Sequence, residues 1–109
     1  MLPELIDKPD LLKAVAEQIK KDFEMAGLRL KTDLSLENCY EDLTNEMTTK
    51  LAWSFQGNKT IFNRVFYRVD INEKVLKDFI KPNPDFEQIT QLIIKRELMK
   101  VVYRVGLGN

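Results

Sequence analysis

The first third of the chain carries apolar residues at the spacing of an amphipathic helix. Asp10 is suited to cap the N-terminus of such a helix, and Gly27 is suited to end it. Between these two residues the apolar side chains recur three or four positions apart, at Leu12, Val15, Ala16, Ile19, Phe23 and Ala26. This period predicts a helix over residues 10–26.

A second helix is predicted after a short connection. Residues 28–31 fit either a short strand or an extended linker, and Ser35 is a good N-cap. One side of this helix would carry Leu36, Tyr40, Leu43 and Met47, and we expect the helix to end near Glu46. The segment is also strongly acidic, since no basic residue interrupts Asp33, Glu37, Glu41, Asp42 and Glu46.

The stretch 47–71 alternates apolar and polar residues on both sides of Gly57-Asn58. Alternation with a period of two is typical of a strand, and the glycine between the two arms favours a turn. The stretch therefore predicts a β-hairpin. Its second arm would place Ile61, Val65, Tyr67, Val69 and Ile71 on one face and Phe62, Arg64, Phe66, Arg68 and Asp70 on the other.

The same stretch also fits a helical pattern. Four apolar residues lie four positions apart, and five more fit one face of a helix: Leu43, Met47, Leu51 and Phe55, then Ile61, Phe62, Val65, Phe66 and Val69. Two fold classes follow. We expect a single α+β domain over residues 1–109, in the order helix, helix, β-hairpin, short helix, long helix. The alternative is an all-α bundle of four to five helices.

The C-terminal part predicts one short and one long helix. Asn72 can cap the short helix, the prolines in 82–84 end it, and Asp85 opens a helix that runs to about Val105. The long helix has two apolar rows, one more than a surface helix needs. The second row is a candidate association seam, made of Ile94, Leu98, Val101 and Val105. On the rest of the helix surface Arg96, Lys100 and Arg104, each four positions apart, form a basic ridge.

Charge and cysteine content limit the kinds of partner and the cellular compartment that we expect for the protein. Seventeen basic residues balance seventeen acidic ones, which argues against a surface built as a whole for polyanions. The acids gather in residues 1–50 and the bases in residues 51–109. Cys39 is alone, and acids stand near the N-terminus where a signal peptide would be basic. We expect a cytoplasmic protein that does not span a membrane.

The residue types argue against catalysis. The chain has no histidine, so the commonest general base and metal ligand is missing. Acids surround Cys39 in the sequence and disfavour its thiolate. The acids of 33–46 match no known metal-binding spacing, and Gly57 is too isolated to form a phosphate loop. We expect no enzymatic activity, no metal and no cofactor.

Two binding functions remain open. The first is a non-catalytic protein–protein interaction module, which could be homodimeric through the association seam of the long helix. The second is a small nucleic-acid-binding protein in which exposed aromatic rings stack on bases and cations contact phosphates. Its surface would consist of Phe62, Arg64, Phe66, Arg68, Arg96, Lys100 and Arg104. That second function depends on the two phenylalanines being exposed, whereas phenylalanine is more often buried.

Overall fold

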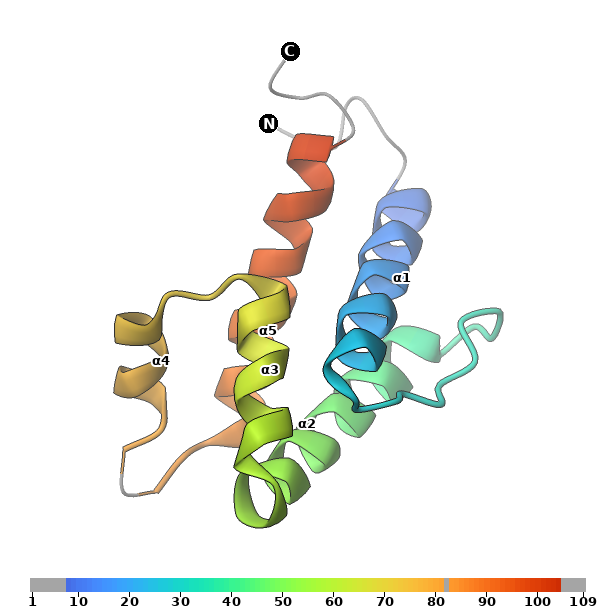
Figure 1. Ribbon diagram of the computed structural model, residues 1–109. Coiled ribbons are helices and arrows are strands. Elements are labelled where there is room, and N and C mark those ends of the chain that lie inside the picture. The colour runs from blue at the N-terminus through green and yellow to red at the C-terminus, as the bar shows by residue number, and fades with distance from the viewer. Residues whose placement is uncertain (1–7, 82, 105–109) are drawn as a thin grey trace.

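The residues that the structure describes form five helices and contain no strand (Figure 1). The computed structural model describes residues 8–81 and 83–104. The helices are α1 (Lys8–Ala26), α2 (Cys39–Gly57), α3 (Lys59–Val69), α4 (Glu73–Phe79) and α5 (Phe86–Val102). The α+β prediction was therefore wrong, and the all-α alternative describes the architecture.

The helical period explains why residues 47–71 do not form a hairpin. In α2 the buried side chains are Leu43, Met47, Leu51 and Ser54, and in α3 they are Phe62, Val65, Phe66 and Val69. A strand would have sent Phe62 and Phe66 to the same face as Arg64 and Arg68, whereas a helix sends the phenylalanines inward and the arginines outward. The helix also satisfies its own backbone hydrogen bonds, which an isolated two-stranded hairpin does only in part.

The predicted turn at Gly57-Asn58 is instead the junction between two helices. Asn58 ends α2, and its side-chain Oδ1 accepts a hydrogen bond from the backbone N–H of Ile61 at 3.3 Å. Asn58 thus caps the N-terminus of α3. The second predicted helix does not end at Glu46, because α2 continues through the segment assigned to the first strand.

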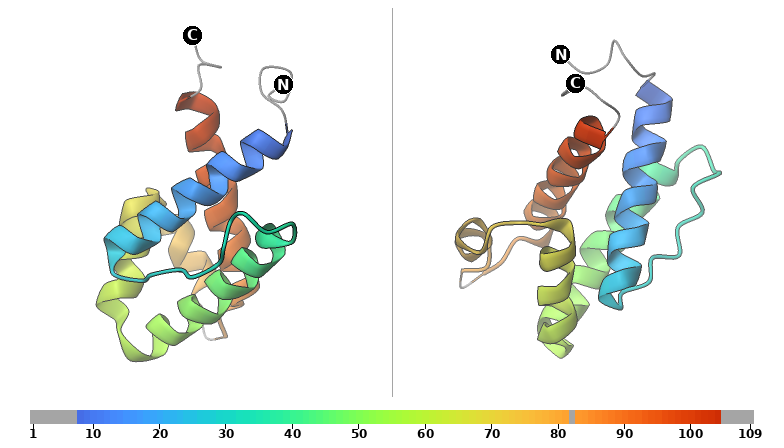
Figure 2. Two further views of the ribbon diagram at one scale, coloured as in Figure 1. Left: turned by 90° about the vertical axis from the view of Figure 1, so that its right-hand side faces the viewer. Right: turned by 45° about the horizontal axis from the view of Figure 1, so that its top comes forward.

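Four of the five helices build one core. Helix α3 packs against α1, α2 and α5, and α5 also packs against α1 and α2. Figure 2 shows α1 lying across α5. The connection between α1 and α2 is extended rather than a strand, and it adds Leu28 and Leu30 to the core. The largest fully buried apolar side chains are Phe23, Phe62, Ile19, Leu43, Met47, Leu51, Ile89 and Ile93.

Helix α4 lies at the edge of the molecule, beside α3 and apart from the other helices (Figures 1 and 2). Asn72 caps it by accepting a hydrogen bond from the Lys74 N–H at 2.7 Å. Its buried side chain is Leu76. Because α4 has seven residues and so little buried surface, its position depends on the two connections that hold its ends.

Candidate interaction surface

A groove between α3 and α4 is the main apolar concavity on the outer side of α3. It has a volume of about 390 Å³ and is lined by Asn63, Phe66, Tyr67, Ile71, Glu73, Leu76, Lys77 and Ile80. Phe66 and Leu76 are buried, and Ile71 and Ile80 are half-buried. We call these lining residues, together with Arg64 and Arg68 on the exposed side of α3, the α3–α4 face.

Tyr67 stands at the rim of this groove with 81% of its surface exposed. It is the most exposed of the large hydrophobic residues described. The helical period causes this exposure, because Phe62, Val65, Phe66 and Val69 occupy the inward face of α3 and leave position 67 on the outer one. A rigid aromatic ring with a hydroxyl at its tip can make both apolar and polar contacts with a partner.

The end of α3 holds the groove in place. Asp70 adopts the left-handed conformation at φ 72°, and its N–H donates to the Phe66 carbonyl at 2.9 Å. Arg96 on α5 donates from Nη2 to Asp70 Oδ2 at 2.8 Å and from Nε to the Asp70 carbonyl at 3.1 Å. This two-point contact fixes the turn between α3 and α4 against α5.

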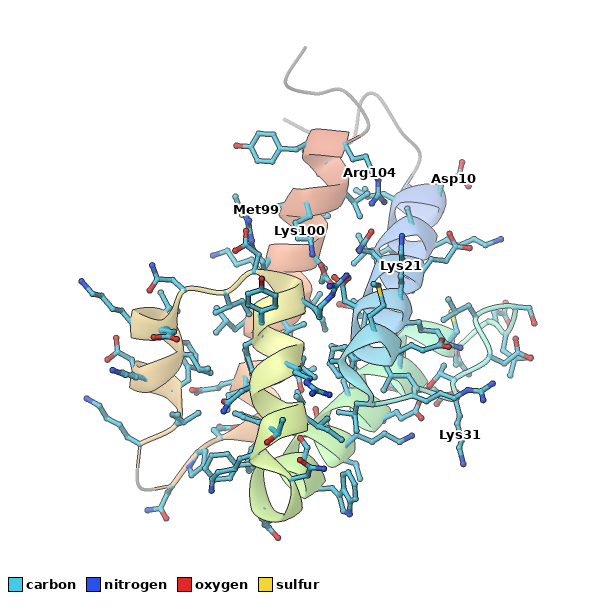
Figure 3. The ribbon with its side chains drawn as sticks, in the orientation of Figure 1. Asp10, Lys21, Lys31, Met99, Lys100 and Arg104 are labelled. Carbon is cyan, nitrogen blue, oxygen red and sulfur yellow. The ribbon has the colours of Figure 1, made fainter. Side chains whose placement is uncertain are left out.

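The basic ridge of α5 contacts α1 and the end of α3, with Arg96 and Lys100 half-buried and Arg104 exposed. Lys100 reaches from α5 toward α1, as Figure 3 shows, and Arg104 points to the same side while Met99 points away. Arg104 donates a hydrogen bond to Gln18 of α1, and Arg96 pairs with Asp70. The three cations are thus engaged with the protein itself.

Lys100 belongs to a buried charged cluster with Asp22 and Glu97. Lys100 Nζ lies 2.8 Å from Asp22 Oδ2, 2.9 Å from Glu97 Oε1 and 3.2 Å from the carbonyl of Arg68 on α3. Asp22 is 4% exposed and Glu97 is 0% exposed. Neither carboxyl oxygen of Glu97 meets the geometry of a hydrogen bond with another described residue, despite the short distance to Lys100.

Burial shifts the protonation of this cluster. Removal from water and the neighbouring Asp22 carboxyl together raise the pKa of Glu97 to about 8, against the opposing effect of Lys100. Burial also acts to raise the pKa of Asp22, but interactions with Glu97, Lys100 and Gln18 outweigh it and hold that pKa below its ordinary value. Burial lowers the pKa of Lys100, yet the two carboxyl groups raise it overall.

The buried charged cluster was not among the residues that the sequence predicted, apart from Lys100. A signal for it was present, because Glu97 lies midway between Ile93 and Val101 in a row of residues four apart. Ile93, Glu97 and Val101 are all fully buried. A charged residue inside an apolar row predicts a buried charge that needs a partner. Its full burial excludes substrate from Glu97, so the cluster has a structural explanation.

The structure separates the predicted nucleic-acid surface into two groups. Phe62 and Phe66 are buried in the core, where their rings lie 4.8 Å apart between centroids. Arg64 and Arg68 are exposed, and Arg68 Nη2 contacts the sulfur of Met25 at 3.1 Å. Exposure of the two phenylalanines, on which base stacking depended, is therefore contradicted. Tyr67 is the exposed aromatic residue of α3.

The candidate association seam lies mostly inside the monomer. Val101 is fully buried, Ile94 is nearly so, and Leu98 is half-buried against the core. Val105 lies outside the described residues. The second apolar row of the long helix is thus explained by α5 being surrounded by α1, α2 and α3.

Two further findings concern metal ions and membranes. Among the side chains of residues 10–81 and 83–104, no three acids or cysteines come together to hold a metal ion. Within the described ranges, no helix has the length and apolar character needed to cross a bilayer. Comparison with protein-family models, curated proteins and solved structures finds no match.

Proposed function

We propose that this chain is a non-catalytic protein-interaction module that binds its partner through the α3–α4 face. The observation that carries the proposal is the position of Tyr67, which is exposed at the rim of an apolar groove. Tyrosine is enriched among the residues that dominate binding energy at protein interfaces. A groove between helices is also a common docking site for an amphipathic segment.

The groove supplies the apolar contacts that such a segment needs. Phe66 and Leu76 form its buried part, while Ile71 and Ile80 keep part of their surface exposed. Burial of the half-exposed groups by a partner would stabilise the complex by roughly 25 cal/mol for each Å² removed from water. Helix α4 has few contacts of its own, so a small movement of α4 can adjust the groove to its occupant.

The other functions have less support. A homodimer through Ile94, Leu98 and Val101 would have to open the monomer core, since α5 uses these residues internally. Nucleic-acid binding has less support because Phe62 and Phe66 are buried and cannot stack on bases. An apolar groove also offers no contacts to the charged phosphate backbone. Arg64, Tyr67 and Arg68 still form an exposed set, so nucleic acid is kept as an outcome of the test.

We also propose a cytoplasmic location for the protein. Cys39 is the single cysteine, so the chain cannot form an intrachain disulfide and has no requirement for an oxidising compartment. A cytoplasmic interaction module is consistent with this. The acidic and basic halves of the chain suit association with a charged protein better than association with a uniform polyanion.

Titration followed by NMR tests the proposed function. The probes are two synthetic helical peptides with the same apolar positions, one bearing glutamates and one lysines, and a single-stranded DNA oligomer. We expect one peptide to shift the backbone amides around Tyr67 and Leu76. The Tyr67→Ser variant should bind at least about tenfold more weakly, which corresponds to about 1.4 kcal/mol.

A matched control is Tyr103→Ser, because Tyr103 is also exposed but belongs to α5. This variant should bind the peptide as the unaltered protein does. The proposal fails if neither peptide shifts α3 or α4 at millimolar concentration. Binding of DNA instead, with shifts at Arg64 and Arg68 and a steep loss with salt, would establish the alternative function.

A further inference from the structure

We infer that the occupant of the α3–α4 face is the acidic end of α2 in a second copy of this chain. This inference rests on the proposed function, since it names the partner of the same surface. By the acidic end of α2 we mean Leu36, Glu37, Tyr40, Glu41 and Asp42, at and just before the start of that helix.

The acidic end of α2 displays apolar side chains next to its charges. Leu36 is 56% exposed and Tyr40 is 38% exposed, and the two are four positions apart. Glu37, Glu41 and Asp42 are exposed around them. None of these three acids lies within 4.0 Å of a basic group of the described residues. The surface thus has the composition of an acidic segment with two apolar anchors.

The other acids of the same segment are already used within the monomer. Glu46 accepts hydrogen bonds from the N–H groups of Lys31 and Thr32, and Asp33 accepts from Ser35. These bonds hold the connection between α1 and α2. Glu37, Glu41 and Asp42 are therefore the acids left for a contact with another molecule.

The α3–α4 face has the opposite charge. Helix α3 contributes the exposed Arg64 and Arg68 to this face, and the helix contains no acid. Asp70, the acid that follows α3, pairs with Arg96. Lys77 lines the groove from α4 and makes no ion pair with a described residue, and Glu73 is the single acid in the lining. Opposite charges around apolar contacts favour association and set its orientation.

The two surfaces cannot meet within one molecule. In Figure 1 the connection that leads into α2 and helix α4 lie at opposite edges of the bundle, and the right-hand view of Figure 2 agrees. A contact between them must therefore join two copies. The two surfaces differ, so a contact between two copies uses the α3–α4 face of one copy and the acidic end of α2 of the other. Each of the two copies can then bind a further copy through its unused surface, and the copies assemble head to tail into a ring or an open chain.

Complementary charge reversals test the inference. The first variant, Arg64→Glu with Lys77→Glu, damages the α3–α4 face but keeps the acidic end of α2. The second, Glu37→Lys with Glu41→Lys, does the reverse. All four side chains are exposed, so both proteins should keep their fold, which circular dichroism checks. Sedimentation equilibrium of the full chain, from low to high salt, measures association.

We expect the unaltered chain to form a series of oligomers that dissociate as salt is added. Each variant alone should associate at least about tenfold more weakly, because its altered surface meets a surface of the same sign. A control with two charges reversed on α1, Lys13→Glu with Lys21→Glu, should associate like the unaltered chain. Both lysines are exposed and lie outside the two surfaces.

Mixtures of the variants separate the outcomes. The altered face of the first variant is acidic and the altered end of the second is basic, so these two surfaces attract each other and an equimolar mixture should regain association that neither variant shows alone. A strictly monomeric unaltered chain at millimolar concentration would overturn the inference. If that chain still bound the glutamate peptide at Tyr67, the proposed function would stand with a different acidic protein as partner. If neither peptide shifted α3 or α4, the proposed function would fall together with the inference.

Discussion

Lys100 Nζ lies 2.8 Å from Oδ2 of Asp22, and this ion pair joins α5 to α1 across 78 positions of the sequence. Lys100 is the single cation of a buried charged cluster that also holds Glu97. Its ammonium group also donates to the Arg68 carbonyl at 3.2 Å, so one side chain links three helices. The helix that carries Tyr67 is thereby tied to the centre of the bundle.

Removal of this cation should be strongly destabilising. The Lys100→Met variant keeps a side chain of similar length but leaves the Asp22 carboxylate buried without a counter-charge. We expect the free energy of unfolding to fall by about 3–5 kcal/mol. Urea denaturation followed by circular dichroism measures the loss. Lys95→Met, at an exposed position of the same helix, should change it by less than about 0.5 kcal/mol.

The stability of the protein should decrease as the solution becomes alkaline. The folded pKa of Glu97 is about 8, above the ordinary value of 4.5, so the folded state keeps a proton that the unfolded state releases. The contribution of Glu97 to the free energy of unfolding is complete below its ordinary pKa of 4.5. It is lost as the pH rises toward its folded pKa of about 8. The loss should be about 2 kcal/mol between about pH 6 and pH 8.

The Glu97→Gln variant tests this origin of the pH dependence. Glutamine has nearly the same shape but does not titrate, so the fall in unfolding free energy between those two pH values should largely disappear. Glu87→Gln, at an exposed position near the start of α5, serves as the control and should keep the slope. An unchanged slope in Glu97→Gln would show that a different group causes it.

Glu46 should contribute to the dependence of the free energy of unfolding on pH under acidic conditions. Its carboxylate accepts from the backbone N–H groups of Lys31 and Thr32 at 2.6 and 2.9 Å, and from the Thr32 hydroxyl at 2.6 Å. Burial acts to raise the pKa of Glu46, but these hydrogen bonds and the one from Lys50 lower it to about 2. Its contribution is present above the ordinary pKa of 4.5 and is lost as pH falls toward 2.

Acid denaturation of Glu46→Gln checks this expectation. The unaltered chain should lose on the order of 2 kcal/mol between about pH 5 and pH 2 through this group, and the variant should be less stable at neutral pH and less sensitive to acid. Glu41→Gln removes an exposed acid from the same helix and should leave the acid transition nearly as it is.

Tyr67 should affect binding without affecting folding. Its side chain is mostly exposed in the monomer, so Tyr67→Ser should change the free energy of unfolding by less than about 0.5 kcal/mol. The same substitution should abolish the concentration-dependent rise in mass that we expect sedimentation to measure for the unaltered chain. A stability loss above about 2 kcal/mol would show that Tyr67 belongs to the fold instead.

Val101 should show the opposite behaviour. It is fully buried, so Val101→Ser places a hydroxyl in the core and leaves a cavity. We expect a loss of about 2–4 kcal/mol in unfolding free energy. Loss of a dimer with unchanged stability would instead restore the association seam as an interface. Denaturation and sedimentation on the same sample distinguish the two results.

Local sequence signals predicted those parts of the fold that neighbouring residues determine. The first helix, predicted over residues 10–26, corresponds to α1, and Gly27 follows it with φ 97° as a helix stop requires. Asn72 and Asp85 cap the helices that they were expected to begin. These predictions succeeded because a cap or a positive φ depends on a few adjacent residues.

The sequence by itself determined that residues 47–71 carry an apolar face to be buried, but it did not determine whether that face has the period of a strand or of a helix. Both a strand and a helix fit the spacing, and only packing of Phe62, Val65 and Phe66 against α1, α2 and α5 decides for the helix. Tertiary structure likewise gave the cations of the basic ridge their partners, because Asp22, Gln18 and Asp70 approach it from distant parts of the chain. The spacing of residues along the chain does not predict such long-range contacts, since they depend on how whole helices pack.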